Sequence, residues 1–413
     1  GSLTVYTLAK QLSKDWRVGL LAGVFVAFAT KLPGYYLTWG RYTLRIGVMI
    51  LPAAMVEAVR AWERHDRWWQ MAALSLLTAG ALLSHYFTAF LLVLFLVLLG
   101  IWWLVETVKS KSADWKLILS IGLASLAGLV LASRWVYRIF VYSSAATRPV
   151  FRVMESDLPK SAWNYLAYLL GPISGYVLIG LGLIGLVWSG LAVKKWHFQV
   201  WALLVCFFAL PTGLRLMNFR NDYFALVAFI PIAVTAAFGI ILLLEKAVAK
   251  RGLSTPLILC VCAALSAAGA WQNAKAINDE TVLATRSDLE ALEWIQTHTP
   301  EDARFFVNTT YWGYDVYRGV DGGGWILPIT GRWSLAPTVF YPFGGELPIF
   351  EAWIDWSKRA SDLDTCNTEF WALVEDAELD YLYIHRGEHG IQAGNLLDCE
   401  GIEKLYDLSL IHI

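Results

Sequence analysis

The residues best suited to phosphate chemistry lie in a polar stretch between two apolar runs. Residues 215–223 read Arg-Leu-Met-Asn-Phe-Arg-Asn-Asp-Tyr. Two cations, two amides and one carboxylate fall within it: Arg215, Arg220, Asn218, Asn221 and Asp222. Guanidinium groups bind phosphate oxygens through paired hydrogen bonds, and ionisable groups at membrane depth usually face a polar cavity. We therefore expect this stretch to bind a phosphate or diphosphate. The alternative is a solvated turn with an Arg220–Asp222 ion pair.

A second candidate stretch, residues 32–43, is an aromatic loop that carries one charge. Arg41 and Tyr42 follow Pro33, Gly34 and Gly40, which shape the loop. Arg41 is suited to bind the phosphate of a lipid headgroup or of a lipid-linked sugar. The alternative is an arginine whose side chain extends to the ordinary bilayer surface.

Three further residues are weaker candidates. His85 stands beside Tyr86 between two apolar runs and could contact a substrate, the alternative being a hydrogen-bonded residue at a helix end. Glu155 and Asp157 lie in a longer polar loop and could act as a metal ligand or a base. Solvated loop charge is the plainer interpretation of both acids.

Near the C-terminus, aromatic and acidic residues alternate with glycines. Tyr311-Trp-Gly-Tyr-Asp315 includes Trp312 and Asp315, whose ring and carboxylate suit sugar or peptide recognition. Asp321-Gly-Gly-Gly-Trp325 follows closely, and successive glycine amides can form an anion-binding nest. The same three glycines are equally typical of a tight turn beneath packed tryptophans.

The apolar runs must position these residues. The chain is 57% hydrophobic and only 16% charged, which is outside the range of soluble domains. Its net charge of −1 argues against a nucleic-acid partner. Nine runs approach the ~20 residues that cross a bilayer. They cover residues 16–32, 43–60, 68–84, 86–106, 116–133, 164–190, 197–213, 223–245 and 254–272.

Basic residues assign the two sides. Lysine and arginine gather in alternate connections, for example in 10–17, 60–67, 109–116 and 246–251. By the positive-inside bias these connections are cytoplasmic, so the chain begins inside. The stretches 32–43 and 215–223, with Trp39 and Asn218, then share the external side with the C-terminal part.

From about residue 285 the composition becomes that of a soluble domain. A capping box, Ser287-Asp-Leu-Glu290, predicts a helix to about Thr299. Strands are expected at 304–308 and 381–385, a helix at 368–377, and a long ordered loop at 311–345. We therefore expect a multi-pass α-helical membrane domain, 1–272, and an extracytoplasmic α/β domain, 273–407. Cys366 and Cys399 could form a disulfide there, the alternative being two free thiols.

Both ends suggest a fragment. The chain has no initiator Met, and Gly1-Ser2 could be a cloning remnant or an internal start. Residues 408–413 resemble the translation of a sequencing adaptor, so we expect them to play no part in the fold.

Taken together, these features resemble the C-type (GT-C) superfamily of polyprenyl-phosphate-dependent membrane glycosyltransferases. In layout the chain is nearest to the catalytic subunit of oligosaccharyltransferase. Pro33-Gly34-Tyr35 with 39–43 is similar to an external loop of that family, and Arg220 stands where the family has an arginine that binds the carrier phosphate. Glu155 falls in the corresponding acidic loop. The motif at 311–315 is only loosely similar to Trp-Trp-Asp-Tyr-Gly.

The resemblance implies an enzyme whose main catalytic aspartate lies in the first external loop, upstream of Gly1. It also implies a divalent cation, Mg²⁺ or Mn²⁺. The loop at 32–43 lacks the family's acidic residues, and no His-Glu-x-x-His or Cys-x-x-Cys spacing supports a metal. The chain also has no P-loop for ATP-driven transport.

Two functions remain open from the sequence. The first is a cell-membrane glycosyltransferase that moves a sugar from a polyprenyl-phosphate-linked donor to an extracytoplasmic acceptor. Its substrate-binding residues would be Arg41, Tyr42, His85, Arg215, Asn218, Arg220, Asp222, Trp312 and Asp315. The second is a non-enzymatic scaffold or transporter for envelope polysaccharide, which predicts polar groups at mid-bilayer depth. The apolar runs contain few of them.

Overall fold

Long apolar runs form helices in the first two thirds of the chain. The computed structural model describes residues 1–32, 34, 42–63, 67–112, 114–145, 166, 170–171, 174–192, 196–210, 216, 219, 221–248, 254–274, 284–313, 316–336, 347–385, 389–396 and 399–407. Contacts divide the chain into two units. We call residues 1–137 with 156–278 the helical unit, and residues 138–155 with 279–413 the C-terminal unit.

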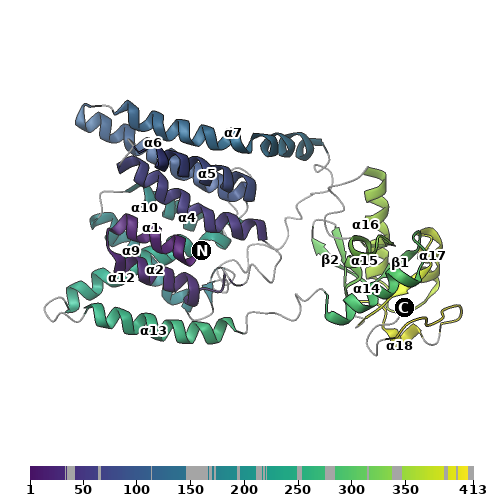
Figure 1. The fold of residues 1–413 in the computed structure, drawn as a ribbon. Coiled ribbons are helices and arrows are strands. Elements are labelled where there is room, and N and C mark those ends of the chain that lie inside the picture. The colour runs from purple at the N-terminus through teal and green to yellow at the C-terminus, as the bar shows by residue number, and fades with distance from the viewer. Residues whose placement is uncertain are drawn as a thin grey trace. The chain divides into compact units, whose positions relative to one another are not determined.

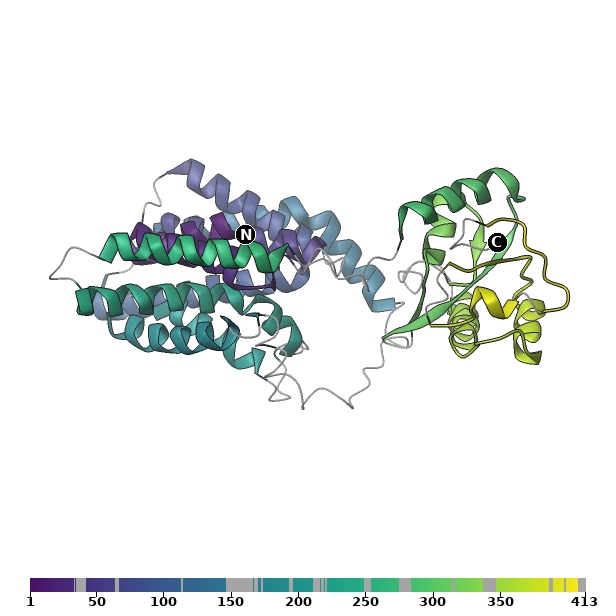
Figure 2. The same cartoon turned by 90° about the horizontal axis from the view of Figure 1, so that it is seen from below.

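The helices of the first part run side by side in a bundle (Figures 1 and 2). In chain order they are α1 (Ser2–Ser13), α2 (Trp16–Val24), the π-helical η1 (Phe25–Ala29), α4 (Tyr42–Glu63), α5 (Trp68–Ser84), α6 (Tyr86–Ser110), α7 (Trp115–Ala145), α9 (Ser174–Ala192), α10 (Trp196–Ala209), α11 (Asn221–Val227), α12 (Phe229–Val248) and α13 (Ser254–Asn273).

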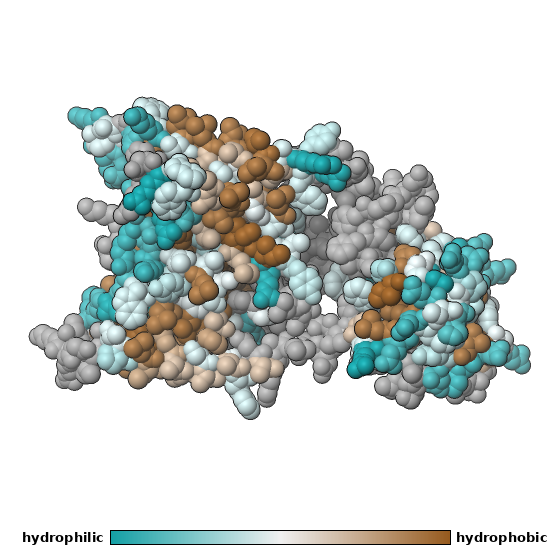
Figure 3. Space-filling view, in the orientation of Figure 1, coloured by the Kyte–Doolittle hydropathy of each residue, from teal (hydrophilic) through white to brown (hydrophobic). Residues whose placement is uncertain are grey.

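Four of these helices are long and apolar enough to cross a membrane. They are Tyr42–Glu63, Tyr86–Ser110, Trp115–Arg138 and Phe229–Lys246. Shorter apolar helices cover Trp16–Ala29, Gly175–Val187, Trp196–Ala209 and Thr255–Trp271. Apolar side chains gather across the outside of the bundle, as a lipid-facing surface requires (Figure 3). The chain is therefore a multi-pass membrane protein, and the full count of nine spans stays a prediction.

Close helix packing in the bundle depends on glycine. Gly185 of α9 lies against the Thr235 carbonyl of α12, and a Cβ atom at Gly185 would overlap it. Gly47 of α4 lies against Thr88 of α6 and Ser84 of α5 in the same way. Small residues let the backbones of apolar helices approach closely, which is how membrane helices gain packing contacts.

The C-terminal unit is a small α/β fold. Its sheet is parallel, in the order β4 (Trp333–Ser334), β1 (Arg304–Val307) and β5 (Tyr381–Tyr383). A separate antiparallel hairpin pairs β2 (Thr309–Gly313) with β3 (Val316–Gly319). The helices are α14 (Arg286–His298), the 3₁₀ helix η4 (Gly323–Trp325), α15 (Ile326–Thr330), α16 (Leu347–Ser361), α17 (Thr368–Asp376) and α18 (Ala393–Leu396). Phe305, Phe306 and Phe370 form the centre of its core.

Two expectations for this unit were wrong. The capping box lies two residues earlier than predicted. Thr285 is the N-cap of α14, and the Asp288 side chain accepts a hydrogen bond from the Thr285 backbone N–H. The expected long loop is the β2–β3 hairpin followed by η4, α15 and β4 over its described part, because local backbone pairing satisfies its polar groups. Cys366 and Cys399 are joined in a disulfide.

Candidate functional site

His85 separates α5 from α6 at one end of the bundle. Its backbone is extended, and its Nδ1 accepts a hydrogen bond of 3.1 Å from the Phe87 backbone N–H. His85 therefore acts as the N-cap of α6, which is the helix-end role that the sequence left open. A neutral imidazole that accepts at Nδ1 carries its proton on Nε2. The ring stacks on Tyr86 with 4.4 Å between centroids.

A hydrogen bond connects the first turn of α6 to the first turn of α11. The hydroxyl oxygens of Tyr86 and Tyr223 lie 2.8 Å apart, within hydrogen-bonding distance. Asn221, at the start of α11, donates from Nδ2 to the Phe208 carbonyl at 2.7 Å. Asp222 lies between these two anchored residues in the first turn of α11. The backbone directly after position 220 is therefore fixed on both sides of Asp222.

Aromatic rings complete this junction. Phe219 stacks on Tyr86 at 5.7 Å and meets Phe87 edge-on at 4.9 Å. The Phe219 N–H donates to the Leu216 carbonyl at 3.0 Å. We call His85, Tyr86, Phe87, Phe219 and Tyr223 the aromatic cluster. It joins the predicted external connection at His85 to the described part of the stretch 215–223.

Tyr42 begins α4 at the same end of the bundle. Gly47, one turn further along α4, lies against Ser84 and Thr88, which flank His85 in sequence. Tyr42 itself is exposed. One end of the bundle thus holds the start of α4, the α5–α6 junction and the start of α11. The prediction that these connections share the external side requires this arrangement.

The charged connections meet at the opposite end. Lys14 pairs with Glu63 at 2.9 Å, which joins the end of α1 to the end of α4. Arg17 pairs with Glu245 at 2.5 Å, which joins the start of α2 to α12. The connection between α1 and α2 and the C-terminal ends of α4 and α12 thus meet at the bundle end away from the aromatic cluster.

Several predicted site residues lie outside the described residues. These are Arg41, Arg215, Asn218, Arg220 and Asp315, together with Trp39, Glu155 and Asp157. Within the described ranges, no three His, Cys, Asp or Glu side chains come together in a way that could hold a metal ion.

Trp312 lies on the β2–β3 hairpin of the C-terminal unit. Its ring is half exposed, and the Arg318 guanidinium lies 5.3 Å from the ring centroid. On the same hairpin, Tyr311 and Tyr317 meet edge-to-face at 5.5 Å. An exposed aromatic face beside a cation suits a polar ring or a carboxylate as ligand.

The three glycines after Asp321 make a tight turn over a buried polar network. Gly322 has φ +81°, and a Cβ there would come within 2.6 Å of Asp288 Oδ1. Asp288 Oδ1 accepts hydrogen bonds from Tyr383 Oη at 2.5 Å and from His385 Nδ1 at 2.8 Å. The glycines are therefore explained by packing, which is the alternative that the sequence left open for them.

No local pattern in the sequence indicates this network, because Asp288 and Tyr383 are 95 residues apart. Thr285 satisfies the other carboxylate oxygen, Oδ2, through its N–H at 2.5 Å and its hydroxyl at 2.6 Å. Burial, reinforced by the Asp288 charge, raises the pKa of Tyr383 above its ordinary value. The network fastens α14 to the strand β5.

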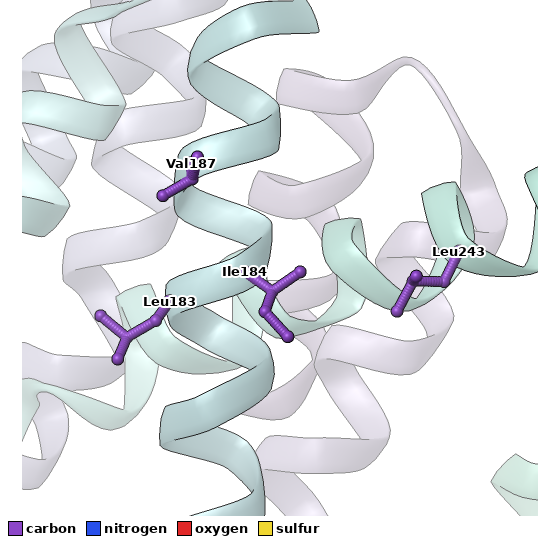
Figure 4. Close-up of a pocket in the computed structure, with 4 residues that line it drawn as sticks. All are labelled: Leu183, Ile184, Val187 and Leu243. Carbon is purple, nitrogen blue, oxygen red and sulfur yellow. The ribbon is translucent and has the colours of Figure 1, made fainter.

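A hollow of about 520 Å³ on the helical unit is lined by apolar side chains. Leu183, Ile184 and Val187 of α9 and Leu243 of α12 line it (Figure 4). Leu243 is close in sequence to Glu245, which lies at the bundle end away from the aromatic cluster. This hollow suits a hydrocarbon chain rather than a polar substrate.

The fold defines a class: a bundle of apolar helices followed by a small α/β unit. Among solved structures, the chain is similar to the crystal structure of the Archaeoglobus fulgidus oligosaccharyltransferase in the apo form, with a TM-score of 0.54 and 14% identity. The match covers 93% of this chain and 57% of that one, so the chain spans little more than half of its neighbour's length. At this identity the likeness concerns the fold alone. No family model and no curated protein matches the sequence.

Proposed function

We propose that the chain is part of a membrane glycosyltransferase that moves a sugar from a polyprenyl-phosphate-linked donor to an extracytoplasmic acceptor. The observation that carries the proposal is the aromatic cluster. It gathers the junction at His85 and the segment that ends in Tyr223 at one end of the bundle, with Tyr42 nearby. The likeness of the fold to an archaeal oligosaccharyltransferase supports the same class.

The donor phosphate would be held by Arg220 and Arg215, with Asn218 and Arg41 as further ligands. Arg220 directly precedes Asn221 and follows Phe219, and both of these residues are anchored to neighbouring helices. Guanidinium groups bind phosphate oxygens through paired, charge-assisted hydrogen bonds, which suits the phosphate of a lipid-linked donor.

Hydroxyl and imidazole groups of the aromatic cluster would contact the sugar. A tyrosine hydroxyl both donates and accepts hydrogen bonds, so the paired hydroxyls of Tyr86 and Tyr223 are of the kind that binds sugar hydroxyls. The His85 ring belongs to the same cluster and stacks on Tyr86. Among the described carboxylates, Asp222 is the nearest in sequence to Tyr223. It would orient a sugar hydroxyl.

The C-terminal unit would help to position the acceptor through Trp312 and Asp315. A disulfide between Cys366 and Cys399 suits an oxidising compartment, which supports an extracytoplasmic location for this unit. An acidic base and a divalent cation, Mg²⁺ or Mn²⁺, would complete the reaction.

The direct test is binding of a polyprenyl phosphate by the full-length protein with Arg215→Ala and Arg220→Ala. We expect the double variant to bind at least tenfold more weakly, since each charge-assisted contact contributes about 1.5–3 kcal/mol. Lys109→Ala is the matched control, because Lys109 is an exposed cation near the end of α6 away from the aromatic cluster. Unchanged affinity in the double variant would remove the assignment.

A scaffold or transporter of envelope polysaccharide is the alternative. The observation that favours it is a group of buried polar residues on α5, namely Gln70, Ser75 and Thr78. Ser75 and Thr78 pack against Gly128 of α7, so helix contact explains part of this group. Sugar transfer to an acceptor by the purified full-length protein decides between the two, because a scaffold gives none.

A further inference from the structure

The C-terminal unit exposes large apolar side chains on elements that pack against each other. Leu289 of α14 is 54% exposed, Trp325 at the end of η4 is 42% exposed, and Ile329 of α15 is 41% exposed. In Figure 3, apolar side chains gather on this unit over the region where Figure 1 draws α14 and α15. We call these three residues the interfacial patch.

Contacts of the neighbouring residues bring the segments that carry these three side chains close together. Asp288, next to Leu289, lies against Gly322, and the Trp325 N–H donates to the Gly322 carbonyl at 2.9 Å. Ile329 follows Trp325 by four residues, one helical turn along the same face.

A second contact joins the C-terminal end of α14 to the residue after α15. Arg332, just after α15, donates from Nη2 to the Gln296 carbonyl at 2.9 Å. Leu289 precedes Gln296 by two helical turns, so both lie on the same side of α14. The three exposed side chains therefore lie on elements that contact one another, α14 with α15 and α15 with η4.

The composition of the patch is that of a membrane interface. Tryptophan with aliphatic neighbours is the combination that settles at headgroup depth, where one side of the ring is apolar and the other is wet. Arg286 stands at its edge with a 93% exposed side chain, in a loose pair with Glu290 at 3.6 Å. A cation at the rim suits lipid phosphates.

The chain itself holds the patch near a bilayer. The apolar helix α13 ends at Asn273 and α14 begins at Arg286, so twelve residues connect them. Such a connection spans at most about 45 Å. Tethering at this range raises the effective concentration of a surface at the membrane, so a small patch is sufficient for docking.

We propose that the interfacial patch docks onto the lipid headgroups of the bilayer that contains the protein's own helices. Docking would hold α14 and the sheet behind it at a fixed height above the membrane. This inference depends on the apolar helices and the connection after α13, and not on the proposed transferase activity.

Site-specific fluorescence in the full chain tests the proposal. The free cysteines of the helical unit are replaced by alanine, the disulfide is kept, and a single NBD label is attached to Ile329→Cys. The matched control carries the label at Glu375→Cys, an exposed position on α17. Each protein is placed in vesicles of phosphatidylcholine and phosphatidylglycerol, 3:1, with or without doxyl-labelled lipid.

We expect doxyl lipid to quench the label at position 329 at least threefold more than the label at position 375. Adding Leu289→Gln and Trp325→Gln to the position-329 protein should reduce quenching to the control level. Equal quenching at the two positions would overturn the proposal. So would blue-shifted emission at position 329 without lipid quenching, since that result assigns the patch to a protein surface, and so would quenching that persists in the glutamine variant.

Discussion

Tyr86 and Tyr223 are 137 residues apart in the sequence, yet their hydroxyl oxygens lie 2.8 Å apart. This bond connects the first turn of α6 to the first turn of α11. His85, Phe87 and Phe219 pack around it, so the bond is part of an aromatic junction rather than an isolated surface contact. The candidate phosphate-binding residue Arg220 lies between two members of this junction in sequence.

Removing either hydroxyl of the pair should loosen the segment around Arg220. For Tyr86→Phe or Tyr223→Phe we expect about 1 kcal/mol lower stability, the typical contribution of one hydrogen bond, and three- to tenfold weaker polyprenyl-phosphate binding. The double variant should cost no more than one single variant, because both remove the same bond. Thermal unfolding in detergent and lipid binding measure these effects. Tyr176→Phe, at an exposed tyrosine of α9, is the control and should change neither.

Gly47 should tolerate no side chain. A methyl group there would overlap Thr88 Oγ1 and lie 2.9 Å from Ser84 Oγ, so α4 must move away from the His85 junction. We expect Gly47→Ala to lower stability by about 1–3 kcal/mol, the usual cost of overpacking. Gly100→Ala on α6 is the matched control, since nothing lies within 4 Å of its Cβ position. Alanine there should stabilise slightly, because it favours the helix over glycine. A similar loss at both positions would show that the contact at Gly47 is not responsible.

Features that depend on local signals could be predicted from the sequence. The break at His85 was predicted and is present, because a single extended residue is enough to end one helix and cap the next. The helix beginning at Thr368 is present too, and the Asn367 side chain caps it by accepting from the Phe370 N–H at 3.0 Å. The α/β character of the C-terminal unit follows from the same kind of alternating local pattern.

Features that depend on contacts between residues far apart in the chain could not be predicted from the sequence. Asp288 was part of a predicted capping box, but its bonds to Tyr383 and His385 are set by how the sheet brings α14 to β5. The Gly322 turn exists to make room for that carboxylate. For the candidate site, His85 and Asp222 stay predictions from the sequence. The Tyr86–Tyr223 bond could not be predicted, since no pattern of spacing links two tyrosines on separate helices.

Gly322 and Gly331 offer a matched pair for measuring the contact with Asp288. Both have positive φ, +81° and +76°, but a Cβ at Gly322 meets the Asp288 carboxylate, whereas nothing lies within 4 Å of a Cβ at Gly331. We expect Gly331→Ala to cost about 1–2 kcal/mol for the left-handed backbone alone. Gly322→Ala should cost about 1–3 kcal/mol more because of the added overlap. Denaturant unfolding of the full chain, followed by near-UV circular dichroism, gives both values. Equal losses would contradict the close approach to Asp288.

The raised pKa of Tyr383 predicts the pH dependence of the C-terminal unit. Burial and the Asp288 charge disfavour the phenolate in the folded state, whereas the unfolded chain titrates near the ordinary value of about 10. The stabilising contribution is therefore fully present below about pH 10 and is lost as pH rises from there toward the folded pKa. Tyr383→Phe removes this titration. It should lower stability at pH 7 by about 1–2 kcal/mol, because Asp288 loses a donor, and flatten the decline above pH 10. Unfolding free energies at pH 7 to 11 measure both effects, with Tyr381→Phe on the same strand as the control. An unchanged alkaline slope in Tyr383→Phe would assign the decline to other groups.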